Sequence, residues 1–411
     1  MSELSYLEKL LDGAEVEWLP LGVLGELVRG NGLPKTDFTE AGIPAIHYGQ
    51  IYTFYGLSTE TTKSFVSQDT AKKLKKVNTG DVVITNTSEN LDDVGKALVY
   101  LGKEQAVTGG HATIFKPREG IIGKYFAYFT QTNSFYNEKR KYSKGTKVID
   151  VSASDMAKII IPIPCPNNPE KSLAIQLEIV RILDKFTALT AELTAELTMR
   201  KKQYNYYRDQ LLSLEEDEIE WKALDDVCAF ISAGGDVPEN SVKGQVKPTN
   251  EYPYPIYANA TDEKGLYGYT DSYKIDSDAV TISARGAKVG YHTVRDAKFT
   301  PIIRLIVLVA NKNLVRTRYL NYVLDMTAIG GTDGGIPQLT VPMVKKITVP
   351  IPFASNPNRS LAEQDRIIAI LDKFEILTNS ISEGLPREIN LRQKQYEYYR
   401  DLLLSFPKSN V

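Results

Sequence analysis

The feature that most constrains the fold is an internal duplication of the sequence. Residues Ile161–Ala174 read IPIPCPNNPEKSLA, and Val349–Ala362, which begin 188 positions later, read VPIPFASNPNRSLA. Further along, QYNYYRDQLLS at Gln203–Ser213 recurs as QYEYYRDLLLS at Gln395–Ser405, with nine of eleven residues identical. Two unrelated helices would share periodicity but not identity, so the chain contains two copies of one unit.

Each copy ends in a segment with the pattern of a long helix. In the first copy, apolar residues recur at spacings of three, four or seven, at Ile179, Ile182, Phe186, Leu189, Leu193, Leu197, Tyr204, Tyr207 and Leu211. Such a stripe suits pairing with another helix. The 40 residues from Leu173 to Leu212 would span about 60 Å. We therefore expect two long antiparallel helices that form a coiled coil.

Signals for the ends of these helices are also present. Ser172 and Ser360 follow proline-containing loops and are the expected N-caps, and Ser360–Glu363 has the sequence of a capping box. The second copy contains Gly384-Leu385-Pro386, so we expect a kink or break there.

The stretches that precede the shared segments differ almost completely between the two copies. Short strand-like runs between Gly-, Asn- and Thr-rich turns indicate mixed α/β (α+β) domains. The only two tryptophans, Trp18 and Trp221, lie at equivalent positions and are expected to anchor the cores. The expected division is an N-terminal helical stump at 1–15 that packs near the C-terminus, variable domains at 16–165 and 218–353, and helical spacers at 166–217 and 354–411.

The composition excludes several kinds of site. With only Cys165 and Cys228 in 411 residues, a disulfide framework or a cysteine zinc site is excluded, and a reducing compartment, the cytoplasm, is expected. The apolar stretches Ile159–Pro164 and Ile302–Ala310 are far shorter than the ~20 residues of a membrane span. Met1–Gly13 lacks the basic and apolar regions of a secretory signal.

Motifs for catalysis are missing as well. The three histidines have no metal-ligand spacing, and no segment fits a glycine-rich phosphate loop. Asn168-Pro169 and Asn356-Pro357 lack the second proline of a DNA amino-methyltransferase motif. Asp262–Lys264 and Asp296–Lys298 fit a nuclease carboxylate pattern, but that pattern arises by chance in most charged chains. We therefore expect no catalytic site, no metal and no cofactor bound by this chain.

The charge is unevenly distributed along the chain. The net charge of −2 argues at first against a nucleic-acid partner. However, Lys63–Lys147 contains 15 basic and eight acidic residues, and Lys243–Arg318 contains 12 basic and seven acidic residues. Two basic domains on a neutral or acidic frame are what a bipartite phosphate-binding protein would show, although two solvated basic faces would look the same.

With the duplication, the variable halves and the long helices established, the chain resembles the specificity subunit of type I restriction–modification systems. The motifs that carry the resemblance are an Ile/Pro run before NPxxSLA, then ILDKF, then QYxYYRD, in both copies. The tetrapeptide TAEL occurs twice in succession at Thr190–Leu197, and in this feature the chain resembles the type IC subgroup.

The resemblance implies a DNA reader that is not itself an enzyme. Each target recognition domain would read one half of a split double-stranded DNA site, and the helices would set the gap and bind two modification subunits. Those subunits would carry S-adenosylmethionine and methylate adenine, and translocating restriction subunits would join, so that ATP and magnesium are also expected on partner subunits. No membrane partner is implied.

Candidate base readers are polar residues in the loops of the variable regions, because direct readout needs donors and acceptors at the groove edges. In the first domain the candidates are Lys35, Thr36, Gln50, Asn86, Ser88, Asn90, His111 and Lys144. In the second domain they are Asn259, Thr261, Arg285, Lys288, Tyr291, His292 and Gln338. Turn chemistry or a solvated loop is the competing interpretation of each.

Three other functions stay open at this point. A specificity module of a type IIB-like system would have the same fold and DNA role but a different partner. A helical scaffold that binds protein or glycan ligands would bind DNA without sequence preference or salt dependence. An undetected nuclease would cleave DNA in magnesium without any partner.

Overall fold

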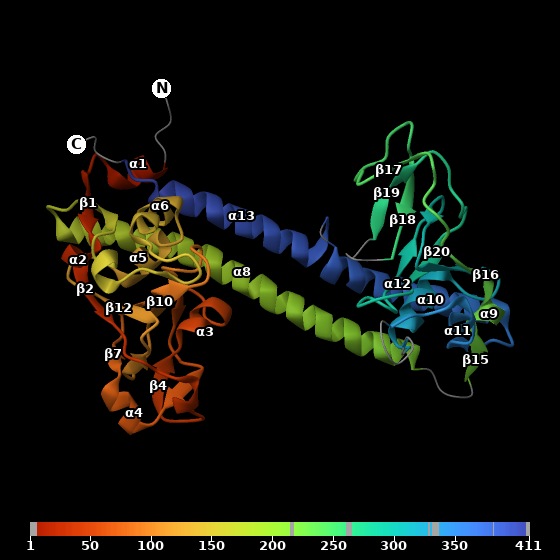
Figure 1. The fold of residues 1–411 in the computed structure, drawn as a ribbon, viewed down its shortest axis with the longest axis horizontal. Helices are drawn as coiled ribbons and strands as arrows, with labels where there is room; N and C mark the ends of the chain where they lie inside the picture. Colours follow the sequence, from red (N-terminus) through yellow and green to blue (C-terminus); the bar gives the residue numbers. More distant parts are fainter. Residues whose placement is uncertain are drawn as a thin grey trace. The chain divides into compact units, whose positions relative to one another are not determined.

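The computed structural model describes residues 6–213, 218–259, 265–327, 329–330, 337–380 and 382–407. The chain divides into two compact units (Figure 1). Unit 1 comprises Met1–Leu193 with Ile389–Val411, and unit 2 comprises Thr194–Glu388. Among the helices of the described ranges, none is long and apolar enough to cross a membrane.

Unit 1 contains two five-stranded sheets. The first has the order β2 (Gly25–Arg29), β12 (Ala112–Pro117), β8 (Val82–Thr85), β10 (Ala97–Tyr100), β5 (Ser58–Thr59). The second has the order β3 (Phe38–Thr39), β6 (Ser64–Val66), β4 (Ile43–Ile46), β11 (Ala106–Thr108), β7 (Lys75–Val77). Every residue of β8 (VVIT) and β10 (ALVY) is buried, as a short apolar run in a sheet interior requires.

Helices cover the first sheet of unit 1. The variable domain of unit 1 also contains the short elements α2 (Leu21–Leu24), η1 (Lys35–Asp37), α3 (Tyr48–Thr53), α4 (Gln68–Lys73), β9 (Thr87–Ser88), α5 (Gly123–Phe129), α6 (Asn133–Tyr142), β13 (Ile149–Asp150) and α7 (Ala153–Met156). The rings of Phe115 in β12 and Phe126 in α5 meet at 5.0 Å, and both side chains are fully buried. The main core of unit 1 therefore lies between this sheet and α5.

Unit 2 repeats this topology with shorter sheets. Its sheets have the orders β16 (Cys228–Ala233), β23 (Leu305–Ala310), β20 (Ala279–Ser283), β21 (His292–Arg295) and β17 (Ser241–Lys243), β19 (Leu266–Thr270), β18 (Tyr254–Tyr257), β22 (Thr300–Pro301). Its short helices are α9 (Leu224–Val227), α10 (Thr317–Asp325) and α11 (Val341–Lys345). The predicted mixed α/β class with a pseudo-twofold internal repeat is confirmed.

A two-stranded sheet closes each variable domain. β1 (Val16–Pro20) pairs with β14 (Ile160–Pro164), and β15 (Ile219–Ala223) pairs with β24 (Thr348–Pro352). In β1, Trp18 packs against Phe129 at 6.0 Å, and its indole N–H donates to Pro407 O at 3.0 Å. Trp221, at the same register in β15, is 60% exposed. The prediction of a core anchor is therefore wrong for Trp221.

The long helices follow these two-stranded sheets. α8 (Pro169–Leu212) has 44 residues, about 66 Å of helix. Its counterpart is divided into α12 (Pro357–Asn379) and α13 (Gly384–Leu404). The predicted break is confirmed: Gly384 has φ +72°, outside the helical region, and Pro386 supplies no backbone N–H. Within unit 1, α8 pairs with α13, and within unit 2 it pairs with α12, in opposite directions (Figure 1).

The helix starts differ from prediction. Asn168 and Asn356 are the capping residues, because each side-chain oxygen accepts from the backbone N–H three residues later, at 3.0 and 3.2 Å. A proline follows each asparagine and begins the helix. Ser172 and Ser360 lie one turn further in and are buried. The predicted capping box is therefore wrong, and Glu363 pairs with the arginine three residues later.

Both ends of the described chain contribute to one core. α1 (Tyr6–Leu11) buries Leu7 and Leu11 in the main core of unit 1. The same core contains Leu403, Leu404 and Phe406 from the end of α13 and the residues after it.

Candidate nucleic-acid interface

Each unit has an exposed turn, and the two turns lie at equivalent points of equivalent sheets. In unit 1, Asn86 N donates to His111 O at 3.1 Å, directly before β12. In unit 2, Ala284 N donates to Arg304 O at 2.9 Å, directly before β23. His111 and Arg304 are both exposed. These two residues therefore occupy equivalent positions, although the sequences around them differ.

A glycine after the neighbouring strand lets the chain approach each turn closely. Gly30 N donates to the first residue of β12 at 2.9 Å, and Gly234 N donates to the first residue of β23 at 2.7 Å. A Cβ on Gly30 would lie 2.1 Å from Gly109 O, and one on Gly234 would lie 2.3 Å from Ile302 O. A larger residue would therefore push these turns apart.

A third segment completes each group. Val151 N donates to Asn86 O at 2.9 Å, and Leu339 N donates to Ala284 O at 2.8 Å. Gln338 in unit 2 thus matches position 150 in unit 1. We call turn cluster 1 the residues Gly30, Asn86, Thr87, Gly109, Gly110, His111 and Asp150, and turn cluster 2 the residues Gly234, Ala284, Arg285, Ile302, Ile303, Arg304 and Gln338.

Aromatic and imidazole rings border turn cluster 1. The Tyr48 ring lies 4.6 Å from the ring of His47 and 4.8 Å from that of His111. Thr87 Oγ1 lies 2.7 Å from His111 Nδ1. Burial lowers the pKa of His47, and the charges of Lys35 and His111 lower it further. The lowered pKa favours the neutral imidazole of His47, whose two ring nitrogens are one donor and one acceptor beside turn cluster 1.

Turn cluster 2 is cationic. Asn259 holds the backbone of Arg285, donating to Arg285 O at 2.9 Å and accepting from Arg285 N at 3.3 Å. Arg285 also forms a β-bridge with Gln338. Beside them lies a hollow of about 540 Å³, to which Arg304 contributes and whose lining includes no aspartate or glutamate among the described residues. The hollow suits a ligand rich in hydrogen-bond acceptors.

Several predicted readers of the first domain lie near turn cluster 1. Lys35 and Thr36 are exposed in η1, and Lys35 is close enough to affect the pKa of His47. Ser88 is half-buried, two residues after Asn86. These three residues and His111 stay candidates for contact with DNA.

Other predicted readers of the first domain have internal partners. Gln50, in α3, donates to Ser64 Oγ at 2.6 Å. Asn90 donates to Asp93 Oδ2 at 2.8 Å and caps its backbone N–H at the same distance, which is turn chemistry. Contact with DNA would require these side chains to leave their partners.

Two predicted readers are tied into the fold. Asn86 is fully buried and donates to Thr113 Oγ1 at 3.2 Å, so its side chain cannot reach a base in this conformation. Lys144 bridges to Asp155 Oδ2 at 2.8 Å, and this contact, with a second one from Lys158, holds the pKa of Asp155 well below its usual range. Asn86 therefore has a structural role in this conformation. The Lys144 side chain is 76% exposed, so its contact with DNA stays a prediction.

The predicted readers of the second domain also separate into two groups. Asn259, Arg285 and Gln338 belong to or support turn cluster 2, and Lys288 is exposed nearby in sequence. Tyr291 and His292 lie at β21, where His292 Nε2 is 3.2 Å from Asp325 Oδ1 and the imidazole is mostly buried. His292 therefore has an internal partner, and its contact with DNA stays a prediction. Thr261 lies outside the described residues.

Each variable domain contacts the long helix that follows it, and the two sets of contacts involve equivalent residues. Tyr128 OH donates to Asp184 Oδ1 at 2.7 Å, and Tyr322 OH donates to Asp372 Oδ1 at 2.6 Å. Both aspartates belong to an ILDKF motif. The basic residue four positions before each tyrosine pairs with the same aspartate at 2.8 Å. We call each group a clamp.

A buried glutamine adds to each clamp. Gln176 accepts from a backbone N–H at 2.9 Å and donates to a backbone carbonyl at 2.8 Å in the loop before α5. Gln364 makes the same contacts, at 2.8 and 3.0 Å, in the loop before α10. Both side chains are fully buried, so these bonds fix the domain on its helix.

Comparison with known proteins identifies the family. The profile of the type I restriction modification DNA specificity domain matches residues 15–199 and again 216–391. The chain belongs to this family. Each match covers one variable domain and most of the helical segment that follows it, so the family repeat is the repeat seen in the sequence.

Relatives agree over nearly the whole chain. The EcoR124I/EcoR124II specificity subunit of Escherichia coli is 37% identical, covering 99% of this chain and 98% of the relative. The EcoprrI specificity subunit of Escherichia coli is 34% identical, covering 93% of each chain. A type I S subunit from M. genitalium shares the fold, with a TM-score of 0.59 at 14% identity over 97% of this chain and 98% of that one.

In this member of the type I family, Arg304 of turn cluster 2 is not among the base readers predicted from the sequence. His111 follows two glycines, whereas Arg304 follows two isoleucines. The signal shared by the two sites is an exposed polar residue directly before a buried strand, at β12 and β23. Only the register of the strands shows that the two positions correspond.

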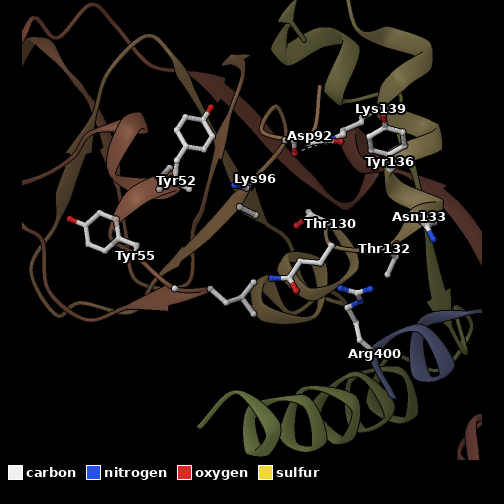
Figure 2. Close-up of a pocket in the computed structure, with 16 residues that line it drawn as sticks. Tyr52, Tyr55, Asp92, Lys96, Thr130, Thr132, Asn133, Tyr136, Lys139 and Arg400 are labelled. Atoms are coloured by element: carbon white, nitrogen blue, oxygen red, sulfur yellow. Dashed lines mark hydrogen bonds between the residues drawn. The ribbon is translucent and has the colours of Figure 1, made fainter. Parts of the chain in front are cut away.

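A second hollow lies in unit 1, where α3, α6 and α13 approach one another (Figure 2). It measures about 490 Å³. Burial lowers the pKa of Lys139 to about 8, and its Nζ donates to Asp92 O at 3.2 Å. Lys96 pairs with Asp93, and Arg400 pairs with Asp401. Because each cation in its wall already has a partner, this hollow is a poor anion site.

Within the described ranges, no group of three or more His, Cys, Asp or Glu side chains could hold a metal ion.

Proposed function

We propose that this chain is the DNA-recognition subunit of a type I restriction–modification complex, and that each unit reads one half of a bipartite DNA site. The observation that supports this most directly is the repetition of the turn clusters. Two domains of the same topology, both in a specificity family, offer different polar side chains at the same point. Equivalent scaffolds with different readers are what a split site with two unlike halves requires.

The proposal assigns the helices two roles. Because the clamps fix each domain on α8 or α12, helix length would set the gap between the half-sites. The same helices would dock two modification subunits, which would carry S-adenosylmethionine, while the restriction subunits would use ATP and magnesium. The chain itself would be non-catalytic and, because its ligand is DNA, would act in the cytoplasm.

Electrostatics limits how much charge is free for DNA. Part of the basic excess counted in the sequence is used inside the units: Lys124 pairs with Asp184, and Arg316 pairs with Asp365. The cations around the turn clusters, such as Lys35 and Lys288, have exposed side chains. These would contact phosphates.

The salt dependence of DNA binding tests this function. The full chain with its modification subunits should bind DNA with an affinity that falls linearly, on logarithmic axes, with salt concentration, by ~0.9 per phosphate neutralised. A specific duplex should compete at least about a thousandfold better than random DNA, because the affinity of a specific protein–DNA complex typically exceeds that of non-specific binding by at least this factor. Binding that depends on neither salt nor sequence would instead support a scaffold for protein or glycan ligands.

A further inference from the structure

Within unit 2, Arg304 has the features of a ligand-binding residue. It lies at the exposed turn before β23, with φ +70°. A non-glycine residue costs about 1 kcal/mol or more in this left-handed region and is held there by its surroundings. Here the turn is held by the bond from Ala284 N to Arg304 O and by the bridge between Gly235 and Ile302.

The guanidinium of Arg304 differs from those of Arg316 and Arg318 in the same unit. Arg316 and Arg318 each pair with carboxylates of α12, at 2.9 and 2.8 Å. Among the described residues, Arg304 has no recorded ion pair or side-chain hydrogen bond. Its neighbours Arg285 and Gln338 line the same hollow, whose described lining residues include no carboxylate. The fold therefore presents an exposed planar donor on a backbone position that the surrounding bonds hold in place.

We infer that Arg304 reads a guanine in the half-site of unit 2, an inference that rests on the proposed function. Guanine offers two acceptors, O6 and N7, on one edge in the major groove, and the arginine fork matches them. Arg285 and Gln338 border the same contact. Turn cluster 1 presents His111 at the equivalent position, so the two units place chemically different readers at one site.

The test uses 7-deazaguanine, which lacks the N7 acceptor, as the probe. The recognised site is first identified by methylation mapping, and each of its guanines is then replaced in turn. Binding is measured for the full chain with its modification subunits. The wild-type complex should lose about tenfold in affinity when one particular guanine of one half-site is replaced, because one bond of the pair is lost.

Arg304→Gly is the matched variant, since glycine accepts φ +70° without strain and the variant should melt no lower than wild type. We expect it to lose about ten- to hundredfold in affinity for the natural site. It should lose nothing further when the same guanine is replaced. Lys288→Gln, which removes an exposed cation close in sequence, should keep the wild-type sensitivity to 7-deazaguanine.

Three results would overturn the inference: wild type insensitive to every replacement, Arg304→Gly as sensitive as wild type, or Arg304→Gly weakening all duplexes equally, as a phosphate contact would. Failure of the proposed function would look different. In that case the wild-type complex would show no preference for any sequence, natural or modified.

Discussion

The Phe186 and Tyr399 rings stack, with centroids 5.1 Å apart and planes 19° from parallel. Phe186 ends an ILDKF motif, and Tyr399 lies in the QYxYYRD motif of the other repeat. In unit 2 the reciprocal pair, Phe374 and Tyr207, stacks at 5.5 Å and 26°. Each repeat thus supplies one half of both stacks, which explains why these motifs are nearly identical in the two copies.

We predict that Phe186→Ala and Phe374→Ala each destabilise their own unit by about 1–3 kcal/mol, less than for a fully buried ring because both rings are half-buried. Chemical denaturation of the full chain with probes in each unit would measure this. If either variant left both transitions unchanged, the stacks would not support the helix pairing.

The outermost tyrosines of the two stacks provide a contrasting prediction. Tyr206 and Tyr398 are 61% and 64% exposed and occupy equivalent positions. Aromatic residues are enriched at protein–protein interfaces, so we expect these two exposed side chains to contact partner subunits. Tyr206→Ala and Tyr398→Ala should change unfolding by less than about 0.5 kcal/mol. Each should weaken the binding of one of two modification subunits, measured by titration. Unchanged stoichiometry and affinity in both variants would remove these residues from the docking surface.

The clamps make a third prediction. Tyr128→Phe removes the donor to Asp184 and should destabilise unit 1 by about 1–2 kcal/mol, because it removes a part-buried hydrogen bond to a carboxylate. Tyr206→Phe is the control, since that hydroxyl belongs to an exposed side chain. Equal stability of the two variants would contradict the role of the clamp.

Helix length gives a prediction about the DNA site. Deletion of Thr194–Leu197 removes slightly more than one turn of α8, about 6 Å, or about two base-pair steps at ~3.4 Å each. The preferred gap should shorten while both half-sites keep their sequences. Methylation mapping that returned the original gap would exclude the helix as the ruler.

The His292–Asp325 pair predicts a pH dependence in unit 2. Burial opposes the charged imidazole, but the contact with Asp325 outweighs it and raises the pKa of His292 above its usual value of about 6.5. The contribution to stability is therefore complete below pH ~6.5 and is lost as the pH rises through the folded-state pKa. After correction for the base-catalysed rise of intrinsic exchange, the protection of β21 amides should fall over this range in wild type but not in His292→Asn. The same profile in both proteins would exclude this pair as the cause.

Elements with repeated sequence were predictable, and elements without it were not. Identity between the copies predicts the duplication, the spacing of apolar residues predicts the long α8, and Gly384-Leu385-Pro386 predicts the break in the second copy. The caps were misassigned because Ser172 follows Asn168-Pro169, and either residue fits a helix start until the side-chain contacts are known. The correspondence of His111 and Arg304 depends on strand register and backbone hydrogen bonds between distant segments, which no local pattern in the variable regions records.

Genome-wide mapping of adenine methylation tests the central claim most directly. The host would express this chain together with its modification subunits, and a host lacking only this chain would be the control. We predict one motif made of two specific half-sites separated by a fixed gap without sequence preference. A continuous motif, or DNA methylated no differently from the control, would contradict the account.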